Sequence, residues 1–299
     1  KTADDKNTLV SNVLLALDDI DFGVEGGALR SVYEAGVLDV FLEKKIEFPY
    51  VIGVSAGALN AGNYISKQIG RSARVNIDYV DDPRYIGFKH LLREHSIFNF
   101  DFLFGEPTKE WMPYDENEFL NSNQKYIVGA TNCKTGKENY FERHTYKELT
   151  EILKASSTLP ILSELSYIDG IPYIDGGVAN AIPIDKAIAD GYKKIVVILT
   201  RQKEFKSKSS LFINAVYRIY YRKYPHLVKK MCTMSKRYNQ RTELINKLEK
   251  KGKIFVIRPN KPVRIGKIEK NKRKLKILYE EGRQEALINI DSMLDYLNK

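Results

Sequence analysis

Short apolar runs rich in β-branched residues alternate with helical patterns through the first two hundred residues of this chain. This alternation is typical of an α/β fold, in which a largely parallel sheet is buried between helices. We expect strands at Ile20–Val24, Tyr50–Val54, Tyr126–Ala130, Ile171–Ile174 and Lys194–Leu199. The last run reads as a strand that is buried on both faces. We therefore predict a mostly parallel central sheet of five or six strands, flanked by helices.

Three regions follow from the pattern along the chain. Residues 1–19 precede the first expected strand and form an N-terminal segment, and residues 20–203 form the α/β domain. A Lys- and Ser-rich run near residues 204–210 is typical of a linker, and residues 204–299 are mainly helical, with one strand expected at Ile254–Arg258. The stretch 71–123 has no clear periodicity. It either caps a site or holds a satellite apolar cluster under a long loop.

The charge is distributed unevenly. Residues 1–200 hold 21 Lys and Arg against 29 Asp and Glu, a net charge of −8, whereas residues 201–299 carry a net charge of +18. A basic region of this strength suits a polyanionic surface, either anionic lipid or nucleic acid. The alternative is that its lysines form solvated faces that keep the protein soluble.

The cysteine content and hydropathy of the chain predict a cytoplasmic protein. Any contact with a membrane is expected to be peripheral. Cys133 and Cys232 are the two cysteines, too few for a disulfide framework and without the spacing of a metal site. No run approaches the ~18 apolar residues that a membrane-spanning helix needs. No secretory signal is recognisable either, because the apolar segment 9–17 is short and lacks a cleavage site.

Gly53-Val54-Ser55-Ala56-Gly57 matches the G-x-S-x-G nucleophile elbow. The match lies between an expected strand and a small-residue helix that begins at Ala56, where the mechanism requires it. Glycines at 53 and 57 permit a sharp turn that lifts the serine hydroxyl above the strand. The bare motif is a weak signal, but this context favours Ser55 as a nucleophile.

A second glycine-rich loop, Glu25-Gly26-Gly27-Ala28-Leu29-Arg30, opens the first expected helix. It lacks the spacing of a dinucleotide-binding turn and the Gly-Lys-Ser/Thr of a phosphate loop. Its backbone N–H groups either form an oxyanion hole or the glycines merely permit a tight turn. Arg30 either supports the loop or attracts a lipid phosphate, unless it is an ordinary surface charge.

Asp175-Gly176-Gly177 follows the expected strand Ile171–Ile174, at the edge where α/β sheets build their sites. An unperturbed aspartate, with a pKa of about 3.9, is a weak base, so a base role requires burial or nearby charge to raise that pKa. The nearby Asp169-Gly170 reads as a plain turn. Of the four histidines, only His226 gives the Ser, Asp, His order of an α/β-hydrolase, but its basic helical context favours a surface position. This favours a Ser–Asp dyad.

Together, the glycine-rich loop, the serine elbow and Asp175-Gly176-Gly177, in this order, resemble the patatin-like phospholipase family. The resemblance covers roughly residues 20–200 and is supported by Ala155-Ser156-Ser157. It implies a three-layer fold, a Ser55–Asp175 dyad, and an oxyanion hole from the backbone of Gly26, Gly27 and Ala28. It also implies hydrolysis of lipid acyl esters with no metal or cofactor. The basic region resembles an extension found in some bacterial members.

Two positions depart from the family pattern. Ala28 replaces a third glycine, and Ser31 replaces the glycine that usually follows the arginine. Ala28 still offers its N–H group, whereas the side chain of Ser31 could narrow the site. These changes bear on turnover rate more than on the fold.

We therefore predict a serine acyl hydrolase acting on (phospho)lipid esters, with peripheral contact to anionic membrane through the basic region. The rival interpretation is a weakly active scaffold that binds membrane or nucleic acid. Its nucleic-acid form would use Tyr217, Tyr220, Tyr221 and Tyr224 between basic residues as a stacking surface, although helical packing explains them equally well. We consider nucleic acid the less favoured partner. A third interpretation is an esterase that uses His226 as its base.

Overall fold

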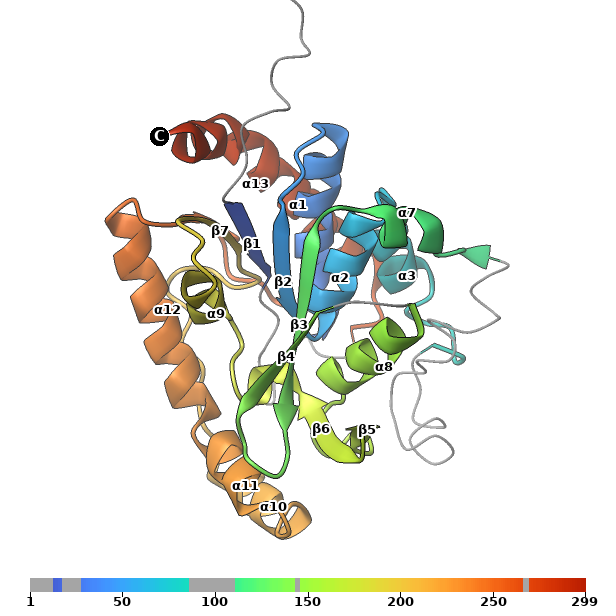
Figure 1. The fold of residues 1–299 in the computed structure, drawn as a ribbon, viewed down its shortest axis with the longest axis vertical. Coiled ribbons are helices and arrows are strands. Elements are labelled where there is room, and N and C mark those ends of the chain that lie inside the picture. Colours follow the sequence, from blue (N-terminus) through green and yellow to red (C-terminus); the bar gives the residue numbers. More distant parts are fainter. Residues whose placement is uncertain (1–12, 18–27, 86–110, 143–145, 266–268) are drawn as a thin grey trace, which may run out of the picture.

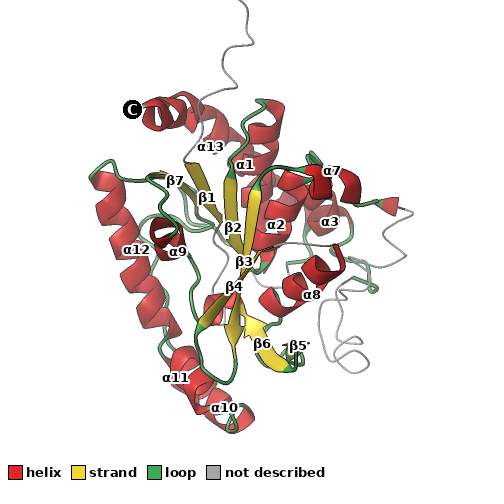
Figure 2. Ribbon diagram, viewed as in Figure 1, coloured by secondary structure: helices red, strands yellow, loops and turns green. Residues whose placement is uncertain are grey.

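The computed structural model describes residues 13–17, 28–85, 111–142, 146–265 and 269–299. In this part of the chain eight strands form one sheet in the order β5-β6-β3-β2-β1-β7-β8, with β4 paired to β3 (Figures 1 and 2). The strands are β1 (Val13–Leu17), β2 (Tyr50–Val54), β3 (Lys125–Asn132), β4 (Glu138–Glu142), β5 (Ser166–Ile168), β6 (Ile171–Asp175), β7 (Lys194–Ile198) and β8 (Phe255–Ile257).

The sheet is mixed. The pairs β2–β3, β1–β2, β1–β7 and β7–β8 are parallel, and β3–β4, β3–β6 and β5–β6 are antiparallel. The predicted α/β class is confirmed, and the expected strands at Tyr50–Val54, Ile171–Ile174 and Lys194–Leu199 agree with β2, β6 and β7 to within a residue. The expected strand at Ile254–Arg258 agrees with β8. The expected number of five or six strands is too small, because β4 and the three-residue strand β5 were not anticipated.

The position of the first strand needs correction. We expected residues 1–19 to precede it, yet Val13–Leu17 forms β1, which lies between β2 and β7 and pairs with both. The predicted range Ile20–Val24 lies outside the described residues. The physical reason is that the continuous apolar run of β1 suits a central parallel strand, whereas Asp21 interrupts the later run and Asp18 and Asp19 directly precede it.

Helices cover both faces of the sheet, which gives the expected three layers (Figure 1). Val51 and Val196 point into one apolar cluster, and their neighbours Ile52 and Val197 point into the other, because successive strand residues face opposite ways. The first cluster includes residues of α1 (Val32–Glu43), α2 (Ala56–Ile65), α3 (Arg71–Asp78), α7 (Glu116–Asn121), α8 (Tyr146–Ser156) and α13 (Lys272–Asn298). The second includes residues of α9 (Ile184–Ala189), α10 (Leu211–Tyr220), α11 (Pro225–Cys232) and α12 (Met234–Lys250).

The basic C-terminal region is mainly helical, as predicted, and it shares the sheet's core. Its strand β8 pairs with β7, and α13 packs closely against α1. A Cβ atom added to Gly282 would lie 2.0 Å from the carbonyl oxygen of Tyr33, so only glycine permits this approach. Arg283 joins the same two helices through hydrogen bonds of 2.8 and 2.9 Å to Glu43. The domain boundaries near residues 20 and 204 stay predictions.

Candidate active site

Ser55 lies in a strained turn between β2 and α2. Its φ of 54° and ψ of −129° are unusual for a residue with a side chain and cost on the order of 1–3 kcal/mol. The turn is tight because α2 folds back over its strand: a Cβ atom on Gly53 would lie 2.7 Å from the Cα of Ala58. Gly57 is buried in the first turn of α2. The predicted strand, elbow and helix are therefore present around Ser55.

The register of β3 brings the end of β2, before Ser55, close to the end of β6 at Asp175. Gly129 pairs with Val54 of β2 and with Tyr140 of β4, while Ala130 pairs with Asp175 of β6 and again with β4. Since β4 occupies one side of β3 throughout, β2 and β6 must share the other side, end to end. The two strands thus terminate against consecutive residues of β3, about 3.3 Å apart along that strand. Ser55 leaves its strand at the point where Asp175 ends the other.

The loop that carries Asp175 is fixed by its backbone. The Asp175 N–H donates to the carbonyl of Thr158 at 3.0 Å, and its own carbonyl accepts from the Thr131 hydroxyl at 2.8 Å. Its carboxylate oxygen Oδ1 accepts from the N–H of Gly177 at 2.9 Å. Gly176 passes so close to β3 that a Cβ atom there would lie 2.2 Å from the Gly129 carbonyl oxygen. Asp175 is fully buried in this arrangement.

Ser156 joins the elbow to β3, a role that the sequence did not reveal. Its hydroxyl accepts a hydrogen bond from the Ser55 N–H at 2.8 Å and donates to the Gly129 carbonyl at 2.7 Å. Ala155-Ser156-Ser157 was identified from the sequence as a family feature. Nothing in two adjacent serines, however, indicates which hydroxyl bridges the elbow and β3. Thr131, which holds the Asp175 loop, carried no sequence signal either.

The predicted oxyanion loop is only partly described. Gly26 and Gly27 lie outside the described residues, and the backbone is described from Ala28, the first residue of the short 3-10 helix η2 (Ala28–Ser31) that leads into α1. Arg30 in η2 is fully buried, so the interpretation of it as a surface charge is wrong. The carbonyl of Ser31 accepts from the amide of Asn60 in α2 at 2.8 Å, which ties η2 to the helix that follows Ser55.

A narrow cavity of about 50 Å³ opens beside Ala56, the residue after Ser55. Ser31 lines it, so the serine that departs from the family pattern does face a space next to the elbow. The apolar and aromatic part of its wall comes from α2, α3, α8 and the predicted cap region: Leu59, Val75, Tyr85, Tyr114, Leu149 and Leu153. The same wall also includes polar side chains, among them Asn60, Arg71 and Asn76. The cap prediction at Phe98, Phe100, Phe102 and Phe104 lies outside the described residues.

The other predicted candidates lie elsewhere. His226 is exposed in α11, where its carbonyl faces Gly136 in the β3–β4 turn, and no hydrogen bond joins it to Ser55 or Asp175 in the described part of the chain. This position disfavours His226 as the base. Asp169 and Gly170 have φ values of 50° and 71° and connect β5 to β6, as expected of a plain turn. Within the described ranges, no group of His, Cys, Asp and Glu has the arrangement of a metal site.

The tyrosines of the proposed stacking surface divide into two kinds. Tyr217 and Tyr221 are buried in the apolar cluster under α10 to α12, which supports the packing interpretation for both. Tyr220 is exposed and Tyr224 is half-buried. Among the described helices, none is both long and apolar enough to cross a membrane.

The fold and the three motifs define a patatin-like protein, and comparison with known families agrees. The model of the family described as patatin-like phospholipase matches residues 24–188, more than half of the chain, so this chain belongs to that family. A second model, described as a domain of unknown function (DUF6363), matches residues 224–298.

Individual relatives are more distant. The chain is 31% identical over 182 residues to "Uncharacterized protein YjjU" of Escherichia coli strain K12, a match covering 59% of this chain and 50% of that protein. It is 30% identical over 195 residues to "Probable lipid hydrolase 463L" of Invertebrate iridescent virus 6, covering 57% and 64%. The match therefore spans between half and two thirds of each relative. Among solved structures, VipD from Legionella pneumophila has a TM-score of 0.48 at 10% identity, covering 94% of this chain and 66% of that one.

Proposed function

We propose that this protein is a serine acyl hydrolase that cleaves fatty acyl esters of lipids. The observation that supports the proposal is the end-to-end meeting of β2 and β6 on β3: strained Ser55 follows the end of β2, and buried Asp175 ends β6. Family membership and the printed name of the viral relative, a probable lipid hydrolase, support the same substrate class.

In the proposed reaction, Ser55 Oγ attacks the ester carbonyl while the Asp175 carboxylate takes the hydroxyl proton. Backbone N–H groups of Gly26, Gly27 and Ala28 stabilise the negative charge that develops on the carbonyl oxygen. The tetrahedral intermediate collapses, and the departing alcohol receives its proton from Asp175. Water then attacks the acyl enzyme and gives a proton to Asp175. As the fatty acid leaves, Asp175 returns this proton to Ser55 Oγ, which regenerates the free enzyme. No cofactor takes part in these steps.

The apolar cavity beside Ala56 supports an acyl chain as the group that is cleaved. It adjoins the residue after the nucleophile, and its wall combines Leu, Val and Tyr side chains with polar ones that include Asn60, Arg71 and Asn76. The apolar part of the wall favours hydrocarbon through burial of apolar surface. In this proposal the acyl chain lies on the α2 and α8 side of the elbow.

The test compares ester hydrolysis by the native chain with Ser55→Ala and Asp175→Asn. We expect each to lower kcat by about 10³-fold or more, as for other members of a catalytic unit that acts together. Asp169→Asn is the matched control for Asp175→Asn, because it makes the same change from carboxylate to amide in the turn before β6. Asparagine also tolerates the positive φ of residue 169. Equal activity of Asp175→Asn and Asp169→Asn would refute the role of Asp175.

We also propose that α10 brings the enzyme to an anionic membrane surface. Leu211, Phe212 and Ile219 are 87%, 79% and 74% exposed and lie on one face of the helix, opposite the buried Tyr217. A single helix that exposes several large apolar side chains is unusual unless it contacts another surface. Arg218 lies between them in sequence, and the exposed Arg222 and Lys223 follow.

The position of α10 suits delivery of lipid to the elbow. The hydroxyl of Tyr221, which ends α10, accepts a hydrogen bond from the N–H of Ile161 at 2.9 Å. Ile161 follows Thr158, whose carbonyl holds Asp175, by three residues. The helix that would meet the membrane is therefore linked to the loop whose Thr158 carbonyl accepts the hydrogen bond from Asp175.

Phe212→Asp should weaken binding to phosphatidylglycerol vesicles about 10-fold or more, because burying a phenylalanine contributes about 1.5–3 kcal/mol. Hydrolysis of a soluble short-chain ester should not change. Ile188→Asp, which alters an exposed apolar residue on α9, is the control and should bind vesicles as the native chain does. If both variants bind vesicles normally, α10 is not the contact surface. Vesicle binding without ester hydrolysis by the native chain would instead favour a membrane-binding scaffold.

A further inference from the structure

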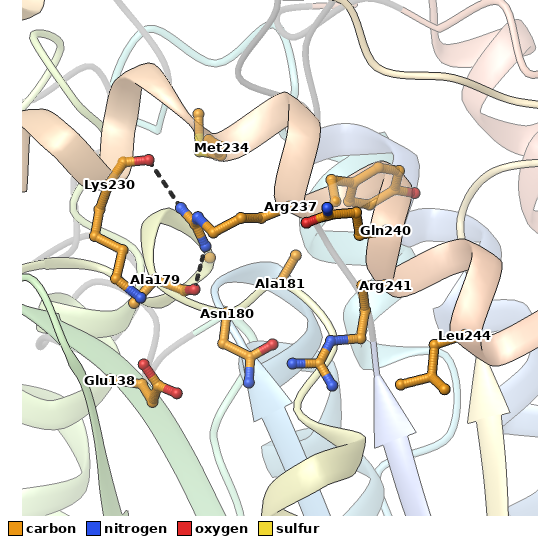
Figure 3. A pocket seen from close by; sticks show the side chains of 12 residues that line it. Glu138, Ala179, Asn180, Ala181, Lys230, Met234, Arg237, Gln240, Arg241 and Leu244 are labelled. Carbon is orange, nitrogen blue, oxygen red and sulfur yellow. Dashed lines mark hydrogen bonds between the residues drawn. The ribbon is translucent and has the colours of Figure 1, made fainter.

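A pocket of about 330 Å³ lies between the loop after Asp175 and the two helices α11 and α12. Figure 3 shows Lys230, Arg237 and Arg241 extending from these helices toward the segment Ala179–Ala181. The carboxylate of Glu138, from β4, lies at the same pocket. Three cationic side chains and one carboxylate thus surround a cavity that is large enough for a small ligand.

Arg237 carries its charge into the pocket without an acidic partner. Its guanidinium donates to the carbonyls of Val178, Ala179 and Lys230, and to the hydroxyl of Thr233. All of these acceptors are neutral oxygens. Within the described residues, no carboxylate lies within ion-pair distance of it, although the side chain is largely buried.

The other two cations retain donors for a ligand. In the described part of the chain, the Lys230 ammonium has neither a hydrogen bond nor an ion pair. Arg241 donates one N–H to Asp185 at 3.0 Å and has further N–H groups. Burial, with the nearby charge of Arg237, lowers the pKa of Lys230, even though Glu138 opposes this effect. Burial likewise lowers the pKa of Arg237. Both shifts mean that burial disfavours the positive charges of Lys230 and Arg237, an effect that a bound anion would offset.

We propose that this pocket binds a phosphate group, with Lys230 and Arg241 as its direct ligands and Arg237 as the buried source of positive potential. Phosphate fits better than a carboxylate because it offers more acceptor oxygens and up to two negative charges to three converging cations. The volume leaves room for a substituent on the phosphate, such as the glycerol of a lipid headgroup.

The site adjoins the proposed catalytic loop. Gly177 forms part of the pocket wall, and its N–H is the donor to the Asp175 carboxylate. Arg237 holds the carbonyls of Val178 and Ala179 directly after it. The basic C-terminal helices therefore reach the loop that carries Asp175, and a phosphate bound here would contact the same segment. The site itself is independent of the proposed hydrolysis.

Calorimetric titration with inorganic phosphate, at constant ionic strength, tests the proposal directly. We expect saturable binding that Lys230→Gln weakens about 10-fold or more, since a charge-assisted hydrogen bond contributes about 1.5–3 kcal/mol. Lys229→Gln removes the same charge from the neighbouring exposed position and should leave the affinity within about 2-fold, as screened surface charges do. Glu138→Gln removes the competing carboxylate and should tighten binding. Unsaturable binding, or equal affinities for Lys230→Gln and Lys229→Gln, would overturn the proposal.

The titration is repeated in a Ser55→Ala background, so that binding is measured whether or not the chain hydrolyses esters. Glycerophosphoglycerol, a soluble headgroup, then distinguishes two sources of the phosphate. Tighter binding of the diester than of inorganic phosphate identifies a headgroup subsite. In that case Lys230→Gln should also raise KM for phosphatidylglycerol but not for an uncharged ester. Tighter binding of inorganic phosphate identifies a site for the free ion.

Discussion

Replacing Ser156 by alanine should separate the elbow from β3 at a cost that the structure allows us to estimate. Its hydroxyl satisfies two buried backbone groups, the Ser55 N–H at 2.8 Å and the Gly129 carbonyl at 2.7 Å. Alanine would leave both without a partner. Each orphaned group costs about 1–3 kcal/mol, so we expect the free energy of unfolding to fall by about 2–6 kcal/mol. Because the N–H belongs to Ser55 itself, the strained turn should also relax, and kcat for a soluble ester should fall.

Ser157→Ala provides the matched control. Ser157 is the next residue and is also buried, but its hydroxyl has no hydrogen-bond partner in the described part of the chain. Its removal should change the free energy of unfolding by no more than about 0.5 kcal/mol, or should stabilise the fold. Urea unfolding and ester hydrolysis of both variants decide the matter. If the two variants unfold at the same urea concentration, or if Ser156→Ala keeps full kcat, the hydroxyl bridge does not hold the elbow.

Two further predictions concern the core. Gly282→Ala should lower the free energy of unfolding, measured in urea, by about 3 kcal/mol, because the added Cβ would overlap a carbonyl of α1 in a packed interface. The control is Gly62→Ala, whose added Cβ would lie 3.4 Å from its nearest neighbour. This variant should instead stabilise its helix by about 0.5–1 kcal/mol. Burial raises the pKa of the Cys133 thiol to about 12, so alkylation at pH 8, followed by mass spectrometry, should modify Cys232 first and Cys133 only on unfolding. The folded state holds the Cys133 proton more tightly than the unfolded state. The contribution of this thiol to stability is therefore fully present below about pH 9 and is lost as the pH rises toward about 12. Rapid alkylation of Cys133 in the native protein would contradict this view of the core.

The sequence predicted those strands and turns whose conformation depends mainly on residues that are close together along the chain. Tyr50–Val54 became a strand because its apolar, β-branched residues suit a position buried on both faces. The turn at Ser55 followed from the two glycines around it, and Asp169-Gly170 from the preference of that pair for positive φ. The sequence also indicated the family, because three short motifs in a fixed order are far more specific than any one of them.

Other features depended on which segments meet in space, and no local pattern records that. The apolar run 13–17 could not be distinguished from a segment outside the sheet until β2 and β7 were seen on either side of it. The sequence also did not determine that Arg30 is buried or that His226 is exposed. Nor did it determine that Ser156, rather than Ser157, forms the hydrogen bonds to the elbow.

The sequence alone determined that Ser55 would stand in a sharp turn after a buried strand and that Asp175 would end another. Only the tertiary structure decided that these strands end against consecutive residues of β3, and that α12 holds the loop after Asp175. The physical reason is that hydrophobic periodicity reports whether a residue is buried, but not which residue buries it. Strand register and helix packing are set by contacts between segments that lie far apart along the chain.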